Sequence, residues 1–433
     1  MYKQYLKQAW QLMKQNRFFS FVYILGTGLA ISMVMIMATV YYIRTADIAP
    51  EDCRSRLLQL NRVSVKSKDE NGGTHNWSLS LHAARQILGE LSEVEKVAFA
   101  INPQAVDILM GTVYSQLPGS PDRYRATVEA VDGAFWQIFR FRFLSGKPFT
   151  GEEFESGVKR VVLSESYARR LFGTIEAEGK AVLLNGLEYR VSGVVRDVSS
   201  VMSMTCADIW IPITSVPVLA ETANAERSAG PVVAYLLVSG PARFEAVRDE
   251  VNRRRLQYNA TLQERYVDTL WLSTPKQTEL QKLDYGSSLS DIIRRYLLIA
   301  LVFMLVPAIN LTGLISSRMQ ERTEEMGLRK AFGAGARTLV SQVLTENLML
   351  TCIGGLAGLL VSWVLVVVLR NFLLGSVGYM ATTGDVQLTF GMLFNFPLFF
   401  SAFGLCVFLN LLSSLLPVWK AVRRPIADSI NDK

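Results

Sequence analysis

The chain has 433 residues, of which half are hydrophobic and 19% are charged, and its formal net charge is +7. The apolar residues are gathered into long runs, which is typical of a membrane protein and argues against a chain of soluble domains. Residues 44–294 hold 30 Lys and Arg against 31 Asp and Glu, so the whole basic excess lies near the apolar runs. Membrane topology explains this excess more simply than nucleic-acid binding, so no nucleic-acid partner is expected.

The N-terminal part of the chain predicts a surface helix followed by a first transmembrane helix. Residues 1–17 carry four basic residues and no acidic one, which favours an amphipathic helix on the cytoplasmic membrane surface. Residues 18–43 contain no charge and exceed the roughly 20 residues that a spanning helix needs. No small-residue cleavage site follows, so this run is interpreted as a transmembrane helix rather than a signal peptide.

Residues 44–294 contain no further candidate span and predict a mixed α+β domain outside the cytoplasm. Alternating apolar residues predict a strand over Leu58–Val65, and helical spacing follows over Leu79–Leu91. Strand-like spacing returns over Val97–Leu109. The polar loop Ser115–Tyr124 contains two prolines and is interpreted as a boundary between two lobes.

The central part of this domain carries strong local signals. Ser164 can cap a helix over Glu165–Phe172, and Gly173 can end it. Asn185-Gly186 between two apolar segments predicts a β-hairpin. Further signals indicate the strand Val232–Val238, the helix Arg243–Gln257 and a helix over Leu280–Arg294 that leads into the membrane.

Three more apolar runs complete a predicted membrane protein with four transmembrane helices and a large extracytoplasmic domain between the first two. The runs are residues 295–316, 346–369 and 392–419, separated by a cytoplasmic segment at 317–345 and a short outer loop at 370–391. The basic residues place both the N-terminus and the tail 420–433 in the cytoplasm of a multi-pass inner-membrane protein.

Small residues mark two of the predicted spans. Gly28 and Ser32 lie four apart in the first span. Gly354, Gly358 and Ser362 repeat this spacing in the third, a stripe that lets another helix approach closely. The same stripe serves packing within one subunit or between two subunits.

The cytoplasmic segment holds a predicted amphipathic helix. Leu328, Ala331 and Phe332 share one helical face, which is surrounded by charged residues. Glu325 stands four residues before Arg329, the favourable order for a helical ion pair, and Gly333 with Gly335 supplies a stop.

The sequence offers little for catalysis or for cofactor binding. No phosphate-binding G-x-x-x-x-G-K-[ST] loop occurs, so any ATP and magnesium are expected on another polypeptide. His75 and His82 are the two histidines, and neither a metal motif nor the G-x-S-x-G of a serine hydrolase accompanies them. Cys53 and Cys206 fall in the extracytoplasmic domain, where they either form a disulfide or stay free.

Two stretches of sequence resemble a known family. The pattern E-x-G-x-R-K-A-x-G-A, from Glu325 to Ala334, resembles the cytoplasmic coupling segment of the FtsX/MacB permease superfamily of ABC transporters. Three phrases, DGAFWQIFRFRFLSGKPF, VVLSESYARRLFG and GKAVLLNGLEYRVSGVVRD, resemble the extracytoplasmic core domain of MacB-type permeases. The ending LLPVWKAVRRPIADSI is similar to the C-terminal tail of the family.

The resemblance implies a non-enzymatic permease subunit that transmits movement from a separate ATPase subunit to its periplasmic domain. In the family the coupling segment docks onto that ATPase, which assigns this role to Arg322, Glu325, Met326, Gly327, Leu328, Arg329, Lys330, Ala331, Gly333 and Ala334. Other implied partners are a second permease subunit in a homo- or heterodimer, membrane lipid, a periplasmic adaptor and an outer-membrane channel. The family also implies that the last part of the outer domain packs beside its first segment.

Several functions stay open on the sequence alone. The MacB-like core favours export of peptides or small toxic compounds, whereas lipoprotein release and control of cell-wall hydrolases use the same architecture. A membrane-anchored ligand sensor would need no ATPase, and a static scaffold would not move at all.

Overall fold

A computed structural model describes the chain apart from residues 1–9, 12, 16, 69–72, 225–227, 284–289, 292, 296, 300, 303–304, 306–312, 314–316, 318–327, 330, 334, 376–385, 394 and 424–433. Contacts divide the chain into two compact units. The helical unit comprises Met1–Tyr42, Ser287–Leu373 and Leu388–Lys433. The sheet unit comprises Ile43–Gly286 and Leu374–Gln387.

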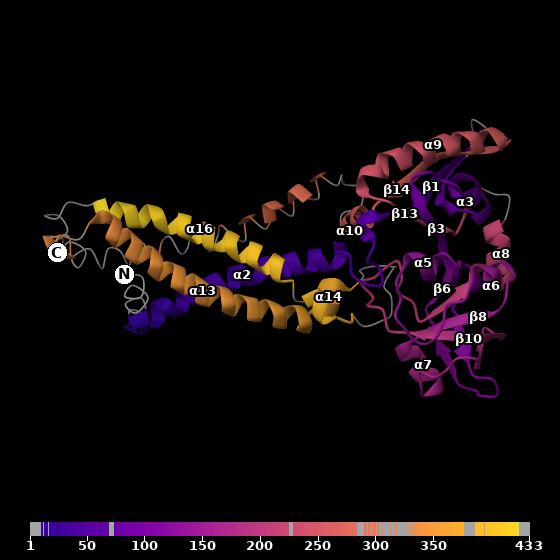
Figure 1. Ribbon diagram of the computed structural model, residues 1–433, viewed down its shortest axis with the longest axis horizontal. Coiled ribbons are helices and arrows are strands. Elements are labelled where there is room, and N and C mark those ends of the chain that lie inside the picture. Colours follow the sequence, from indigo (N-terminus) through magenta and orange to yellow (C-terminus); the bar gives the residue numbers. More distant parts are fainter. Residues whose placement is uncertain are drawn as a thin grey trace. The chain divides into compact units, whose positions relative to one another are not determined.

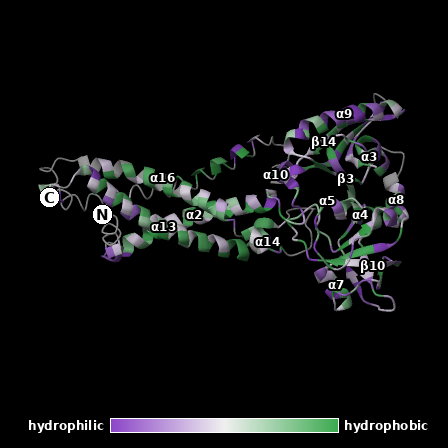
Figure 2. Ribbon diagram, in the orientation of Figure 1, coloured by the Kyte–Doolittle hydropathy of each residue, from purple (hydrophilic) through white to green (hydrophobic). Residues whose placement is uncertain are grey.

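Long apolar helices make up the described part of the helical unit. They are α2 (Arg17–Thr45), whose last turn belongs to the sheet unit, α13 (Ala336–Val368) and α16 (Phe396–Arg423), with the short α14 (Arg370–Leu374) and α15 (Phe390–Leu393). Among the described residues, α2 and α13 are long and apolar enough to cross a membrane. Hydrophobic residues dominate α2, α13 and α16 (Figure 2). Most of the second predicted span, 295–316, lies outside the described residues, so the count of four spans stays a prediction.

The third predicted span and the cytoplasmic segment before it are not separate elements. The predicted span begins at residue 346, and the helix that contains it, α13, begins ten residues earlier, at Ala336. Leu339 and Val343 are buried and lie one turn apart, which extends the apolar face toward the N-terminus of the helix. The last part of the predicted coupling segment is therefore helical and continuous with the span.

The sheet unit is built on one mixed sheet of 14 strands in the order β12-β2-β1-β13-β3-β6-β11-β8-β10-β9-β4-β5, with β14 paired to β1 and β7 to β10. The pairs β8–β10 and β6–β11 are parallel. The strands are β1 (Leu57–Ser67), β2 (Thr74–Leu79), β3 (Val94–Ile101), β4 (Tyr114–Gln116), β5 (Arg123–Arg125), β6 (Val128–Val131), β7 (Phe143–Gly146), β8 (Arg160–Ser164), β9 (Ala181–Leu184), β10 (Leu187–Val195), β11 (Ile209–Pro212), β12 (Ala229–Gly230), β13 (Val233–Val238) and β14 (Arg265–Ser273).

Helices cover this sheet. They are α3 (Leu81–Leu88), α4 (Pro103–Met110), α5 (Phe135–Ile138), α6 (Gly151–Glu155), α7 (Glu165–Phe172), α8 (Pro217–Asn224), α9 (Phe244–Thr261) and α10 (Pro275–Leu283). The long α9 contacts both α3 and β14 (Figure 1). Strand β13 lies between β1 and β3, and β14 pairs with β1. The implied return of the last segment to the side of the first is therefore confirmed.

Two local predictions are confirmed by backbone geometry. The Ser164 side chain accepts a hydrogen bond from the Tyr167 N–H at 3.4 Å, and α7 ends at Gly173, whose φ is 71°. Asn185 and Gly186 have φ of 46° and 85°, as the two-residue hairpin between β9 and β10 requires.

Two other predictions were wrong. The expected strand over Val97–Leu109 stops at Ile101, because the Asn102 side chain accepts from the Ala105 N–H at 2.9 Å and Pro103 opens α4. The polar loop Ser115–Tyr124 forms the tip of the hairpin β4–β5 and is no boundary between lobes.

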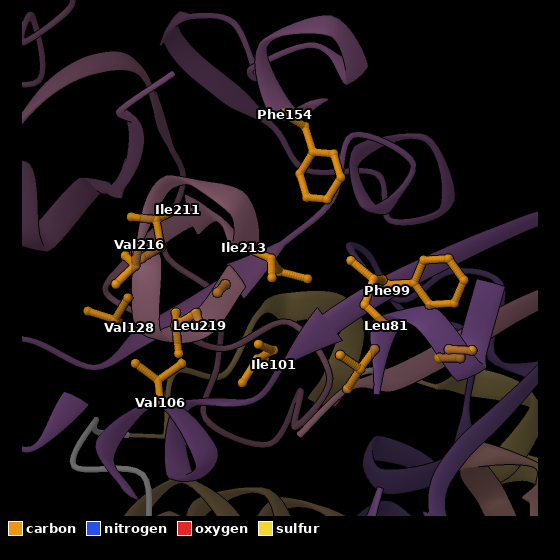
Figure 3. Packing of buried hydrophobic residues seen from close by; sticks show 14 of the residues in the cluster. Leu81, Phe99, Ile101, Val106, Val128, Phe154, Ile211, Ile213, Val216 and Leu219 are labelled. Carbon is orange, nitrogen blue, oxygen red and sulfur yellow. The ribbon is translucent and has the colours of Figure 1, made fainter. Parts of the chain in front are cut away.

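Hydrophobic clusters fill both faces of the sheet. Ile209 and Ile211 belong to one cluster, whereas Trp210 between them belongs to the other. Alternate residues of a strand point to opposite faces, so β11 is buried on both sides. Figure 3 shows Val216 and Leu219 beside Val128 and Ile211 in the first cluster. Aromatic rings around Phe135 and Trp210 dominate the second cluster.

Candidate functional site

The structure describes four of the ten predicted coupling residues, Leu328, Arg329, Ala331 and Gly333. The Phe332 N–H donates to the Leu328 carbonyl at 3.1 Å, forming one helical turn that ends at Gly333 with a φ of 88°. Leu328 is 56% exposed and Phe332 is 85% exposed, so two apolar side chains one turn apart face outward. The other coupling residues lie outside the described part of the chain: Arg322, Glu325, Met326, Gly327, Lys330 and Ala334.

This turn, which we call the coupling turn, is hydrogen-bonded to the long helix that follows it. The Arg329 Nη1 atom donates to the Gln342 Oε1 atom at 3.1 Å. Gln342 lies on α13, which runs without interruption to Val368. A displacement of the turn would therefore reach the helix through a side chain as well as through the backbone.

The predicted small-residue stripe lies against α2 of the same chain. A Cβ atom on Gly28 would stand 3.1 Å from the Gly354 carbonyl oxygen and 3.6 Å from the Gly358 nitrogen. The two backbones are thus in direct contact, which requires glycine at the crossing. Ser362 is also buried, and its hydroxyl donates to the Leu359 carbonyl at 2.7 Å.

Buried polar residues on α13 were not singled out by the sequence analysis. Glu346 and Asn347 are each 4% exposed. The neighbouring Thr351 hydroxyl lies 3.2 Å from the hydroxyl of Tyr23 on α2. The sequence analysis did not single them out because the residues around them are strongly apolar. An ionisable residue in such a helix nevertheless often marks a functional position.

A buried ion pair lies in the sheet unit, next to the end of α2. Glu51 is fully buried and Arg54 is 4% exposed, with 2.5 Å between the Glu51 Oε2 and Arg54 Nη2 atoms. Arg54 Nη1 donates to the carbonyls of Ile43 and Ala46 at 3.2 and 3.3 Å. These are carbonyls at the C-terminal end of a helix, where a cation is favoured.

Glu51 also binds a distant segment, the loop 199–206 between β10 and β11. Its Oε1 atom accepts from the Met204 N–H at 3.0 Å and from the Thr205 hydroxyl at 2.9 Å. The E-x-x-R spacing of the pair is visible in sequence, but these partners are not.

A second polar group extends this set of contacts within the sheet unit. Arg44 lies 3.5 Å from Glu279 of α10, and its Nη2 atom donates to the Leu374 carbonyl at 3.2 Å. Glu279 in turn accepts from the Ser203 hydroxyl at 3.0 Å. We refer to Arg44, Glu51, Arg54, Ser203, Thr205 and Glu279 as the base network.

Cys53 and Cys206 are free thiols in the structure, so the disulfide that the sequence left open is not formed. The Cys53 thiol donates to the Ile138 carbonyl at 3.6 Å, and the Cys206 thiol donates to the Val198 carbonyl at 3.7 Å. Burial raises the pKa of both thiols to about 12, which keeps them protonated and unreactive at neutral pH.

Buried acids complete the polar groups of the sheet unit. Burial raises the pKa of Asp132 to about 7 and raises that of Glu129 well above its ordinary value. Glu129 accepts a hydrogen bond from the Trp210 indole at 3.1 Å. Within the described residues, no group of three His, Cys, Asp or Glu is arranged to hold a metal ion.

Two family profiles match consecutive parts of the chain. The profile of the MacB-like periplasmic core domain matches residues 20–254, and that of the FtsX-like permease C-terminal domain matches residues 297–426. The periplasmic region of MacB from Actinobacillus actinomycetemcomitans, a solved structure, is 13% identical and covers 55% of this chain and 96% of that one with a TM-score of 0.35.

Several curated proteins are similar in sequence. The uncharacterized ABC transporter permease YknZ of Bacillus subtilis is 24% identical over 54% of this chain and 55% of its own length. The pyoverdine export ATP-binding/permease protein PvdT of Pseudomonas syringae pv. tomato is 24% identical over 82% of this chain and 51% of its own length. The macrolide export ATP-binding/permease protein MacB 1 of Yersinia pestis is 25% identical over 57% of this chain and 36% of its own length.

The chain thus spans about half the length, or less, of the curated relatives described above. Its two matched domains follow one another in the order core domain, then permease domain. The core-domain match alone covers more than half of the chain. The chain therefore belongs to the MacB/FtsX family of ABC transporter permeases.

Proposed function

We propose that this chain is the membrane subunit of an ABC exporter, in which ATP hydrolysis on another polypeptide moves the sheet unit on the far side of the membrane. The observation that carries this proposal is the continuity of α13 from the coupling segment onward. Its 33 residues would extend about 50 Å at about 1.5 Å per residue, whereas the hydrocarbon core of a bilayer is about 30 Å thick. Such a helix reaches beyond the bilayer as one stiff element.

The coupling turn has the composition of a docking site for the ATPase. Leu328 and Phe332 expose apolar surface in a basic segment, and Arg329 is tied to α13. Exposed apolar side chains flanked by polar residues are typical of protein interfaces. The partner would therefore bury Phe332, and the helix would move with it.

The substrate class is proposed from the relatives. PvdT is named for pyoverdine export and MacB 1 for macrolide export. We therefore favour peptides or small toxic compounds as the cargo, with the chain in the inner membrane as one of two permease subunits.

The first experiment tests the docking of the ATPase. The full chain, tagged and gently extracted from its own cells, should co-purify with an ATP-binding subunit. Phe332→Ser should weaken binding of the subunit about thirtyfold and so lower its recovery, since losing a buried aromatic anchor often costs about 2 kcal/mol. Arg329→Glu should lower it too, because the bond to Gln342 and the positive charge are both lost.

Phe372→Ser is the matched control, because Phe372 is 83% exposed but lies on α14, outside the coupling segment. It should leave the recovery of the ATPase unchanged. A wild-type chain that never co-purifies with an ATP-binding subunit would favour the ligand sensor and contradict the proposal.

A further inference from the structure

We infer that the base network is the positioning element through which movement of the membrane helices enters the sheet unit, an inference that rests on the function proposed above. The chain passes between the two units at four places, after Tyr42, Gly286, Leu373 and Gln387. Each of these passages has a polar contact near it on its sheet-unit side.

Hydrogen bonds from two arginines connect the first passage with the third. Arg54 donates to the carbonyls of Ile43 and Ala46, where the chain enters the sheet unit. Arg44, in the same turn of α2, donates to the carbonyl of Leu374, the first residue after the third passage. The end of α2 and the segment that follows α13 are thus held by two arginines ten positions apart in sequence.

Polar contacts also lie near the second and fourth passages. Glu279 lies on α10, the helix of the sheet unit that precedes the second passage, and it pairs with Arg44. Gln387 is the last residue before the fourth passage, and its amide donates to the Asp197 carboxylate at 3.3 Å. Asp197 also accepts from the Ser166 N–H at 2.8 Å, at the start of α7.

These contacts converge on the segment between β10 and β11. Asp197 stands two residues after β10, and the loop 199–206 supplies Ser203 to Glu279 and Thr205 to Glu51. Strands β10 and β11 both pair with β8 at the centre of one half of the sheet. A shift at any passage would therefore change the same short segment and, through it, two strands of the sheet.

Burial distinguishes two roles within the network. The Glu51–Arg54 pair is buried and also binds the Met202 sulfur at 3.0 Å, so it forms a fixed anchor. The Arg44 and Glu279 side chains are 16% and 10% exposed, and these two residues come from different elements, α2 and α10. Arg44–Glu279 is therefore the contact that can rearrange without exposing the anchor.

The test compares the response of the loop 199–206 to nucleotide in the complete complex with its ATPase, reconstituted in lipid nanodiscs. Hydrogen–deuterium exchange of this loop is measured without nucleotide and with ATP plus vanadate. The wild-type loop should change its exchange rate with nucleotide. Arg44→Gln and Glu279→Gln should each at least halve that change while ATPase binding is retained.

A matched control and a conservative variant separate positioning from folding. Arg85 forms an exposed ion pair with Glu155 at 2.7 Å elsewhere in the sheet unit, and Arg85→Gln should leave the nucleotide response unchanged. Arg44→Lys keeps the charge opposite Glu279 and should retain most of the response. Thr205→Val removes one hydrogen bond to the Glu51 carboxylate without removing a charge, and it should likewise reduce the response, which provides a test if a charge variant fails to fold.

The outcomes separate the two proposals. Variants that respond to nucleotide as the wild type does would overturn the inference and leave the proposed function standing. The inference is also overturned if the substitutions change the exchange rate of the loop equally with and without nucleotide, since such a change is purely structural. The proposed function would again be left standing. A wild-type complex that binds its ATPase but shows no nucleotide response in the sheet unit would overturn both.

Discussion

Asp132 shows how burial competes with hydrogen bonding at one carboxyl group. Its two oxygens accept from the backbone N–H groups of Phe99 and Phe135 at 3.0 and 2.9 Å, which favours the charged form. Burial nevertheless raises its pKa from 3.8 to about 7, so the cost of desolvating the charge is the larger effect. The folded chain consequently holds this proton at pH values where the unfolded chain has lost it.

We expect the stability of the sheet unit to fall as the pH rises from about 4 to about 7. In that window the folded state holds the Asp132 proton and the unfolded state does not, so the contribution of Asp132 to the free energy of unfolding decreases with pH and is constant above about pH 7. The rise of the Asp132 pKa from 3.8 to about 7 corresponds to about 4 kcal/mol at most. Asp132→Asn should flatten this dependence, measured by urea unfolding of the full chain in detergent with tryptophan fluorescence.

The same variant should also be less stable at low pH, by about 1–3 kcal/mol, because the amide nitrogen would face a backbone N–H group. Asp122→Asn, at an exposed position, is the control and should keep the wild-type dependence. An unchanged slope in Asp132→Asn would show that other groups account for the pH dependence.

Sequence identified single residues only where their partners are close along the chain. Ser164 and Asn185 were predicted because a cap and a hairpin are set by the next few residues. Glu51 was missed because its partners Met204 and Thr205 lie about 150 positions away. Glu346 was missed because one acidic residue hardly lowers the mean hydropathy of a long apolar span.

At the scale of elements, the crossing of α2 and α13 depends on the absence of side chains. A Cβ atom on Gly358 would meet the backbone of Gly28, and a backbone cannot rotate out of the way. We expect Gly358→Ala to force the helices apart and to cost about 1–3 kcal/mol, as overpacking of a close contact usually does. Thermal unfolding in detergent, followed by far-UV circular dichroism, measures this loss.

Gly26 offers a control on α2, the other helix of the crossing, since a Cβ atom there would meet nothing within 4 Å. Gly26→Ala should be neutral or stabilise by up to about 1 kcal/mol, because alanine has the higher helix propensity. If both variants were equally stable, the crossing would not need glycine.

Element boundaries were predicted less well than element types. The small-residue stripe was visible in sequence, yet its spacing could not say which helix it meets. The turn from β3 into α4 was missed because Asn102 and Pro103 interrupt an apolar pattern that continues on both sides. The start of α13 at Ala336 was not predicted, because the apolar run that marks the span begins about one helical turn or more after the helix itself.

At the scale of the whole molecule, the two units have separate hydrophobic cores. The two clusters on the faces of the sheet draw their buried residues from between Cys53 and Val267, and none of these comes from the helical unit. The helical unit has its own contacts, such as the cluster of Tyr23, Leu339, Val343, Leu350 and Val418.

Separate cores predict that the sheet unit folds without the membrane helices. We expect residues 46–283, expressed alone, to be soluble and to unfold cooperatively, because both clusters and all 14 strands are retained. A shorter fragment, 46–224, is the matched control. It lacks β13, which lies between β1 and β3, so the sheet would be divided and its edges exposed.

Size-exclusion chromatography and near-UV circular dichroism distinguish the two fragments. The longer one should be monodisperse with ordered aromatic signals, whereas the shorter one should aggregate or lose those signals. If the longer fragment aggregated while the full chain stayed folded in detergent, the sheet unit would need the helices for its stability. The base network would then not be the sole route by which movement of the membrane helices affects the sheet unit.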